Sequence, residues 1–257
     1  MSIPTPAQND AFAKDGWLKV DGLLDPRLVA GADACAARME SRVSFNERGW
    51  GQSTTSSREV MDLFGGPVKS LLEAMAGAPV RTLGVRMYPV AVANDNCQLA
   101  YMRNSPGACS AYNAHVDGAP NPGQRHLNKH SAMIGVPLTP VRAPLRGNYT
   151  VWPGSHRHVS SYLTQSFAGT NAVEAIWGDF VPPADCLPLQ VLAEPGDVLV
   201  IHHLLLHGTA CNASGETRRM AFFRVNFEFY ADTDLARFAD LWGDWRGLGR
   251  ELESHAD

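Results

Sequence analysis

The chain has 257 residues, of which 45% are hydrophobic and 19% are charged, which is enough to bury a core in one or two domains. Its net charge is −4 and it contains no basic run, which argues against nucleic acid or an anionic membrane surface as a partner. The N-terminal segment is polar, and no apolar run approaches the about 18 residues that a membrane span requires. We therefore expect a soluble, cytoplasmic protein.

The cysteines are odd in number, far apart and without a C-x-x-C pair. This spacing argues against a disulfide framework and against a cysteine-based zinc site, and we expect reduced thiols. The cysteines are Cys35, Cys97, Cys109, Cys186 and Cys211.

The first 79 residues predict a mostly helical block that contains one strand. Pro6 follows Thr5 at a first-turn position and Gly16 stands at the end of the segment, which is typical of a helix. A short strand is predicted at 17–20. Apolar residues at helical spacing predict further helices at 25–43 and 65–79. Residues 44–59 are polar and rich in glycine and serine, so we expect a loop there.

From residue 80 onward, short runs rich in valine, leucine, tyrosine and phenylalanine alternate with turn residues. This pattern is typical of an antiparallel β-sandwich or barrel, and with helices gathered in an N-terminal block it favours a jelly roll. Helical pieces are expected at 160–169 and at 232–252. We expect one domain, 1–257, with a helical block at 1–79, a jelly-roll core at 80–230 and a C-terminal helix at 231–257. The predicted strand runs are 80–92, 98–104, 131–141, 147–155, 187–196, 197–208 and 218–230.

His115 and Asp117 are two residues apart, so on an extended strand both side chains point to the same side. Two neutral imidazoles and one carboxylate on one face of a metal form the triad of non-haem Fe(II) oxygenases. The segment 202–207 carries three histidines that can complete it. Two other interpretations stay open at this point: a surface loop pair at 115–117, and histidines that simply pack in the core.

His207 is followed eleven residues later by Arg218, across a turn. This spacing predicts two adjacent antiparallel strands joined by a short loop. An arginine there can hold a carboxylate with a bidentate fork. A di-acid co-substrate that chelates iron at one end needs such a charge at its other end.

The two arginines at 218 and 219 are adjacent, so on a strand they face opposite sides. We expect Arg218 to point inward with Met220, Phe222 and Arg224. Arg219 is expected to face outward or to form a structural ion pair.

Three motifs carry a family resemblance: "HVD" at 115–117, "GNYTVWPGSH" at 147–156 and "EPGDVLVIHHLLLHGTACNASGETRR" at 194–219. Together with the opening segment "FAKDGWLKVDGLLDPRLV", they resemble the phytanoyl-CoA dioxygenase family over nearly the whole chain. The resemblance implies a double-stranded β-helix, a cupin-like jelly roll. It also implies dependence on Fe(II), 2-oxoglutarate and O2.

Carried over residue by residue, the resemblance implies that His115, Asp117 and His207 bind iron. Arg218 would hold the far carboxylate of 2-oxoglutarate, and Thr209 would place a hydroxyl near that carboxylate. The resemblance also implies that Gln98 lines the co-substrate pocket. Family members that act as halogenases have a small residue in place of the aspartate, so Asp117 argues against halogenation and for hydroxylation or a related C–H oxidation.

The resulting hypothesis is an Fe(II)- and 2-oxoglutarate-dependent dioxygenase. It would hydroxylate an unactivated C–H bond of a small metabolite or natural-product intermediate and release succinate and CO2. The alternatives are desaturation, epimerisation or cyclisation by the same chemistry, and a cupin-type metal enzyme that does not use 2-oxoglutarate. Neither the substrate nor the oligomeric state follows from the sequence. The candidate substrate contacts are Tyr112, Asn148, Trp152 and Arg224. For Arg224 the favoured alternative is a buried ion pair with a strand carboxylate. Strand parity alone does not say which of Asn148, Tyr149 and Trp152 face the pocket.

Overall fold

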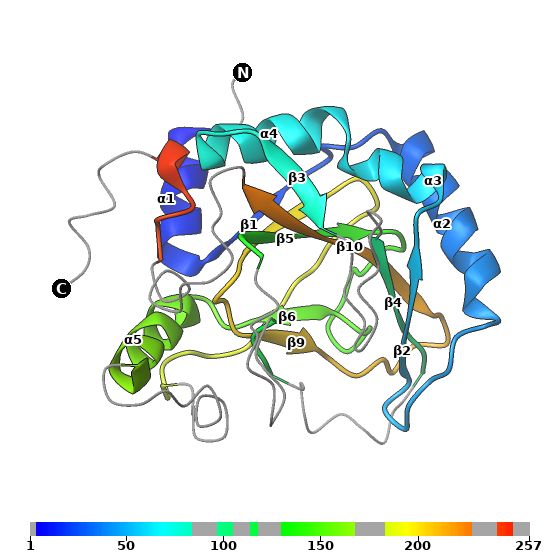
Figure 1. Cartoon of the computed structure of the whole chain (residues 1–257). Helices are drawn as coiled ribbons and strands as arrows, with labels where there is room; N and C mark the ends of the chain where they lie inside the picture. The colour runs from blue at the N-terminus through cyan, green and yellow to red at the C-terminus, as the bar shows by residue number, and fades with distance from the viewer. Residues whose placement is uncertain are drawn as a thin grey trace.

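Two antiparallel sheets face each other in the computed structural model, which describes residues 4–83, 97–104, 114–117, 130–167, 183–227 and 241–248. The larger sheet has the strand order β1-β8-β5-β10-β4-β2, with β3 paired to β10, and the smaller has the order β7-β6-β9 (Figure 1). The fold is thus the predicted jelly roll. The strands are β1 (Trp17–Val20), β2 (Trp50–Thr55), β3 (Val80–Leu83), β4 (Cys97–Met102), β5 (Ala132–Pro137), β6 (Tyr149–Val151), β7 (Leu189–Gln190), β8 (Val198–His202), β9 (His207–Thr209) and β10 (Arg218–Phe227).

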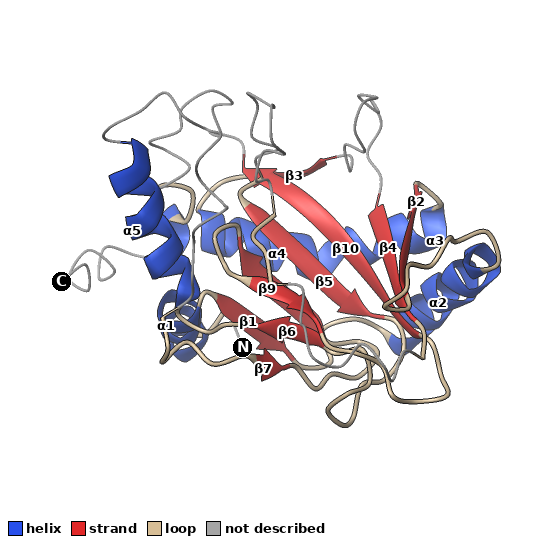
Figure 2. Ribbon diagram, turned by 90° about the horizontal axis from the view of Figure 1, so that it is seen from below, coloured by secondary structure: helices blue, strands red, loops and turns tan. Residues whose placement is uncertain are grey.

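Helices of the N-terminal block cover the outer face of the larger sheet, and the smaller sheet lies across its other face (Figures 1 and 2). The first helix begins as predicted, because the side chain of Thr5 and that of Gln8 cap each other's backbone, and it ends at the left-handed Gly16. The helices are α1 (Pro6–Asp15), α2 (Pro26–Glu40), α3 (Arg58–Met61), α4 (Gly66–Ala76) and α5 (Ser155–Phe167), with 3-10 helices at Asp62–Phe64 and Arg246–Leu248.

The alternation of side chains along β10 divides the interior into two cores. Ala221 and Phe223 pack under the helices in the outer core, where Leu72 and Met75 of α4 also lie. Met220 and Phe222 pack between the two sheets, in the inner core. Because successive strand residues point to opposite faces, one strand supplies both cores. Some residues of the inner core, among them Met133 and Phe222, also line a cavity.

The prediction of a loop over residues 44–59 is wrong. Residues Trp50–Thr55 form β2, which pairs with β4 at the edge of the larger sheet, and α3 begins at Arg58. An edge strand hydrogen-bonds on one side only and is commonly polar, which explains the loop-like composition of this segment.

The run 197–208, predicted as one strand, is two strands in different sheets. β8 ends at His202 and belongs to the larger sheet, whereas β9 begins at His207 and belongs to the smaller sheet. The expectation that His207 and Arg218 lie on adjacent paired strands is therefore wrong. β9 pairs with β6, and β10 pairs with β3, β4 and β5.

The remaining helical predictions are partly correct. α5 begins at Ser155, five residues before the predicted start, and the C-terminal residues 241–248 hold turns and a 3-10 helix where an α-helix was predicted. The rest of the predicted C-terminal helix lies outside the described residues. The division at residues 79 and 230 stays a prediction.

The cysteines depart from the expectation of reduced thiols. Cys211 is disulfide-bonded, whereas Cys35, Cys97 and Cys186 are free and buried. The partner of Cys211 is thus none of the other described cysteines. Wide spacing in the sequence argues against a framework of several bridges, but it does not exclude a single one.

We expect acid to destabilise the protein through its buried histidines. Burial, and next the charge of Arg157, lowers the pKa of His156 to about 3, and burial lowers the pKa of His202 well below 6.5. Unfolded histidines titrate near 6.5, so the unfolded chain binds more protons below that pH. The free energy of unfolding should therefore fall as the pH falls from about 6.5 towards 3. Urea unfolding at several pH values measures this slope.

The variant His156→Phe keeps a ring of similar shape and removes one titrating group. Its unfolding free energy should fall less steeply between about pH 7 and about pH 4 than that of the wild-type protein. Parallel slopes for the two proteins would contradict the contribution of His156.

Candidate metal centre

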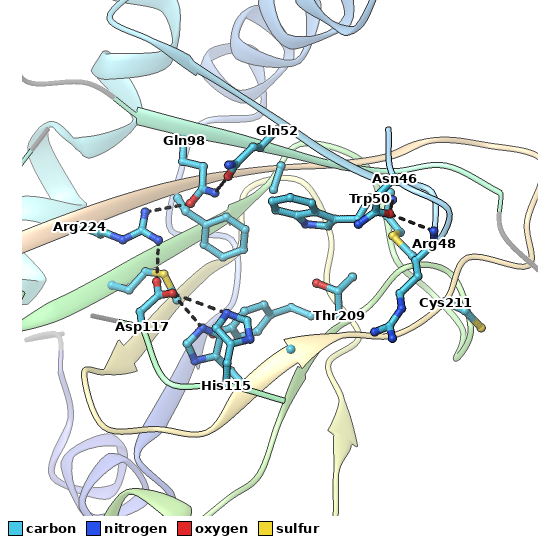
Figure 3. Close-up of a pocket in the computed structure, with 17 residues that line it drawn as sticks. Asn46, Arg48, Trp50, Gln52, Gln98, His115, Asp117, Thr209, Cys211 and Arg224 are labelled. Carbon is cyan, nitrogen blue, oxygen red and sulfur yellow. Dashed lines mark hydrogen bonds and ion pairs between the residues drawn. The ribbon is translucent and has the colours of Figure 1, made fainter. Parts of the chain in front are cut away.

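A cavity of about 460 Å³ opens between the two sheets (Figure 3). Its volume lies in the range of small-molecule sites. It is lined by Asn46, Arg48, Trp50, Gln52, Gln98, Ala100, Met102, His115, Asp117, Met133, Tyr149, His207, Gly208, Thr209, Cys211, Phe222 and Arg224.

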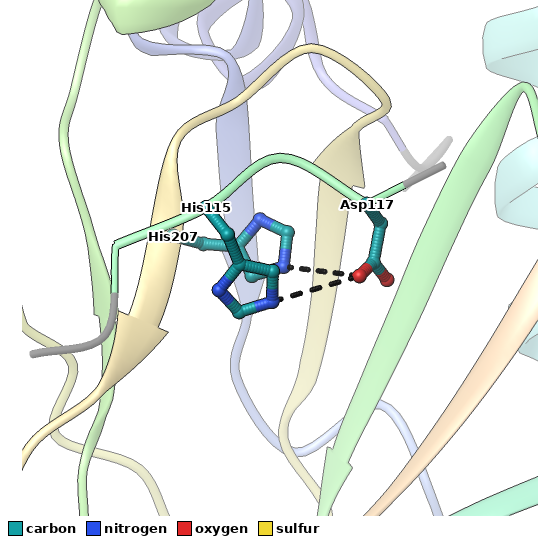
Figure 4. A group of neighbouring side chains, drawn as sticks. All are labelled: His115, Asp117 and His207. Atoms are coloured by element: carbon teal, nitrogen blue, oxygen red, sulfur yellow. Dashed lines mark ion pairs between the residues drawn. The ribbon is translucent and has the colours of Figure 1, made fainter. Parts of the chain in front are cut away.

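His115, Asp117 and His207 come together at this cavity. The backbones of His115 and His207 are bridged by two hydrogen bonds of 2.9 Å. The Nε2 atoms of His115 and His207 lie 3.6 and 3.9 Å from Asp117 Oδ1 (Figure 4). One possible ligand atom from each residue lies within 4.8 Å of the other two. This spacing suits a single metal ion bound by two imidazoles and one carboxylate.

The environment of His207 prepares it as a ligand. Its Nδ1 lies 2.8 Å from the carbonyl oxygen of Leu205. Because a carbonyl only accepts, Nδ1 carries the proton and Nε2 keeps a free lone pair on the cavity side. Burial, and next the proximity of His115, lowers the pKa of His207 to about 4. The ring is thus neutral at physiological pH, which metal binding requires.

The two carboxylate oxygens of Asp117 have different partners. Oδ1 faces both histidines, whereas Oδ2 accepts a hydrogen bond of 2.6 Å from Nη2 of Arg224. Burial alone would raise the pKa of Asp117, but the Arg224 guanidinium and the histidines outweigh it and hold that pKa well below 3.8. Asp117 is therefore ionised, with one oxygen directed at the histidines.

Arg224 is itself fixed by a chain of polar side chains. Its Nη1 donates to Gln98 Oε1 at 2.9 Å, and Gln98 Nε2 donates to Gln52 Oε1 (Figure 3). Gln98 lines the cavity, and its contact with a co-substrate stays a prediction. Arg224 also lines it but pairs with Asp117, so its contact is with a predicted iron ligand. An outer partner of this kind orients a metal-binding carboxylate.

Two of the other predicted substrate contacts, Asn148 and Trp152, do not line the cavity. Asn148 is buried in the structure and bonds to the backbone of Arg146, Ala143 and Val191. Trp152 packs in a separate cluster that includes Leu163. Tyr112 lies outside the described residues.

Arg218 occupies an unusual position for a cation. It is 3% exposed, and its Nε and Nη1 donate to the carbonyls of Gly147 at 2.6 Å and Ala100 at 3.3 Å. It forms no ion pair with any described residue, and burial lowers its pKa to about 10. Ala100 lines the cavity, whereas Arg218 lines a second hollow of about 510 Å³.

Arg219 takes the outward position predicted for it. Its guanidinium donates to both carboxylate oxygens of Asp33, at 2.6 and 3.0 Å, and to Glu40 at 3.3 Å. The prediction of a structural ion pair is confirmed.

Several cavity residues were not predicted. Asn46, Arg48, Trp50 and Gln52 come from the segment that the sequence indicated to be a loop. Tyr149 was considered together with Asn148 and Trp152, and strand parity could not say which of them faces the pocket; of the three, Tyr149 lines the cavity. The sequence indicated a strand here, but it did not show which alternate residues of that strand face the cavity.

The profile of the phytanoyl-CoA dioxygenase (PhyH) family matches residues 12–220. The chain belongs to the phytanoyl-CoA dioxygenase family. The match spans the triad, Thr209 and Arg218, so the resemblance seen in the motifs is confirmed. Among curated protein sequences no match was found. None of the described helices is long and apolar enough to cross a membrane.

Solved structures share this fold at low identity. The non-heme alpha ketoglutarate dependent epimerase SnoN from nogalamycin biosynthesis matches with a TM-score of 0.65 and 20% identity, over 96% of this chain and 91% of that chain. The carbocyclase SnoK from the same biosynthesis matches with a TM-score of 0.62 and 18% identity, over 87% and 84%. HygX from Streptomyces hygroscopicus matches with a TM-score of 0.57 and 16% identity, over 90% of each chain.

Proposed function

We propose that this protein is an Fe(II)- and 2-oxoglutarate-dependent oxygenase acting on a small-molecule substrate. The observation that carries the proposal is the group formed by His115, Asp117 and His207 at the wall of a cavity. Membership in the phytanoyl-CoA dioxygenase family supports it. So do two structures of similar fold: SnoN in complex with Fe3+, alpha ketoglutarate and nogalamycin RO, and HygX with nickel, 2-oxoglutarate and hygromycin B bound.

The residues present fit an iron ion. The set contains one neutral imidazole with its Nε2 free and one ionised carboxylate with a single oxygen directed at the histidines. Three ligands on one side leave further coordination positions for other molecules. Bound iron would supply the activation of O2 that couples decarboxylation of 2-oxoglutarate, to succinate and CO2, to oxidation of the substrate. Arg224 would keep the second oxygen of Asp117 occupied, so that the carboxylate binds through one oxygen.

The residues also fit a dicarboxylate. Arg218 is a buried cation without a carboxylate partner among the described residues, and an unpaired buried charge is costly. A bound carboxylate would complete that pair. Thr209, two residues after His207 on β9, lines the cavity and can donate its hydroxyl to the same group. Arg218 lines the second hollow, and it reaches the wall of the cavity through its bond to the Ala100 carbonyl. We propose that the co-substrate extends from the metal past Thr209 towards this arginine.

For the reaction we propose hydroxylation of a C–H bond of a small metabolite or natural-product intermediate. Epimerisation and cyclisation are the second candidates, because SnoN is an epimerase and SnoK a carbocyclase. The same residues would serve all three outcomes, since binding, orientation and exclusion of water are common to them. Analysis of the product, with each candidate substrate, separates these outcomes.

Spectroscopy and product analysis test whether the protein uses Fe(II) and 2-oxoglutarate. Under anaerobic conditions, Fe(II) and 2-oxoglutarate added together should give a weak visible charge-transfer band. In air the same mixture should convert 2-oxoglutarate to succinate. Metal binding without the band and without succinate would instead favour a cupin-type enzyme that does not use 2-oxoglutarate.

A further inference from the structure

Tyr149 carries a buried hydroxyl without a partner at the wall of the cavity. The side chain is 4% exposed and belongs to β6. Its hydroxyl forms no hydrogen bond in the described part of the chain. A buried hydroxyl that lacks a partner costs about 1–3 kcal/mol, so proteins rarely keep one where phenylalanine would fit. The position therefore points to a ligand.

The surroundings of Tyr149 fix its ring firmly. The ring stacks on the imidazole of His207, with centroids 5.5 Å apart and an interplanar angle of 28°, and it contacts Phe222 at 5.5 Å. In the register of the smaller sheet, Tyr149 lies directly opposite Thr209. It thus stands beside the span from His207 to Thr209, along which a co-substrate would extend from the metal. A phenol in such a place can donate a directed hydrogen bond.

We propose that the Tyr149 hydroxyl binds 2-oxoglutarate by donating a hydrogen bond to one of its carboxylate oxygens. The inference rests on the proposed function, because it requires the co-substrate to occupy this cavity. It gives a reason for a polar group in the inner core, whose other buried residues include Ala100, Met133 and Met220. The hydrogen bond, being made to a charged group, belongs to the stronger kind.

The test uses Tyr149→Phe, which keeps the ring and removes only the hydroxyl. The protein is loaded with Ni(II), and the dissociation constant of 2-oxoglutarate is measured by calorimetry. We expect that constant to rise about 10-fold or more, with the affinity for Ni(II) unchanged. The metal-free variant should unfold at the same temperature as the wild-type protein or higher, because the unpaired hydroxyl is gone.

Tyr101→Phe is the matched control. Tyr101 is also a buried tyrosine, but its hydroxyl donates to the carbonyl of Ala36 at 3.0 Å and contacts Ser53. Its loss should lower stability and leave 2-oxoglutarate binding unchanged. If the wild-type protein binds 2-oxoglutarate and Tyr149→Phe binds it with the same dissociation constant, this inference is overturned and the proposed function is not. Failure of the wild-type protein to bind 2-oxoglutarate would overturn the proposed function and this inference with it.

Discussion

Replacing His207 by alanine is expected to abolish tight metal binding, and with it the charge-transfer band and succinate formation. The imidazole supplies one of three ligand atoms, and its Nδ1 bond to Leu205 holds Nε2 on the cavity side. Loss of a mere outer partner typically weakens metal binding about 10- to 100-fold, so loss of a ligand should exceed that. Titration with Fe(II) under anaerobic conditions, followed by addition of 2-oxoglutarate, measures the effect.

His202→Ala provides the comparison within the same segment. His202 is buried and does not line the cavity, and its Nε2 lies 2.7 Å from the carbonyl oxygen of Leu241. This variant should lose stability and keep its metal affinity. If His207→Ala bound Fe(II) as the wild-type protein does and still gave the band, the assignment of His207 as a ligand would be wrong.

Local patterns in the sequence were sufficient for much of the fold. The spacing of Thr5, Pro6 and Gly16 predicted the limits of α1, because capping depends on neighbouring residues. Alternation along residues 218–224 correctly separated Arg219 from the inward-facing Phe222 and Arg224. Such features depend on backbone geometry over a few residues, which the sequence contains directly.

Features that depend on distant pairing were missed. β2 has the composition of a loop and becomes a strand because β4, about 45 residues away, supplies its hydrogen bonds. The run 197–208 is uniformly apolar, so nothing in its composition marks the point at which the chain leaves one sheet for the other. Which strands pair depends on the arrangement of the whole sheet, and the sequence of one segment does not determine it.

The same division applies to the candidate site. His115 and Asp117 could be paired by their spacing alone, and the family resemblance added His207. The inward face of β6 could not be chosen from the sequence, so Asn148 was predicted where Tyr149 lines the cavity. A shift of one residue in strand register reverses every side chain, and that register is determined by pairing with β9.

Replacing Arg218 by methionine is expected to weaken 2-oxoglutarate binding to the metal-loaded protein by on the order of 100-fold or more, because a buried carboxylate would lose the cation proposed to pair with it. The dissociation constant of 2-oxoglutarate for Arg218→Lys should lie between those for the wild-type protein and Arg218→Met. Lysine keeps the charge but lacks the planar guanidinium that can bind both carboxylate oxygens. Calorimetry with Ni(II)-loaded protein gives both constants. The Ni(II) affinity itself should not change, because Arg218 forms no bond to the triad.

The adjacent Arg219 is the matched control, because it is the same residue type on the opposite face of β10 and already has carboxylate partners. Arg219→Met breaks the ion pairs with Asp33 and Glu40 and should cost on the order of 1 kcal/mol of stability, with 2-oxoglutarate binding intact. If Arg218→Met bound 2-oxoglutarate as tightly as the wild-type protein, the far carboxylate would need another cation. Arg48, which lines the cavity and forms no ion pair in the described residues, would then be the next to test.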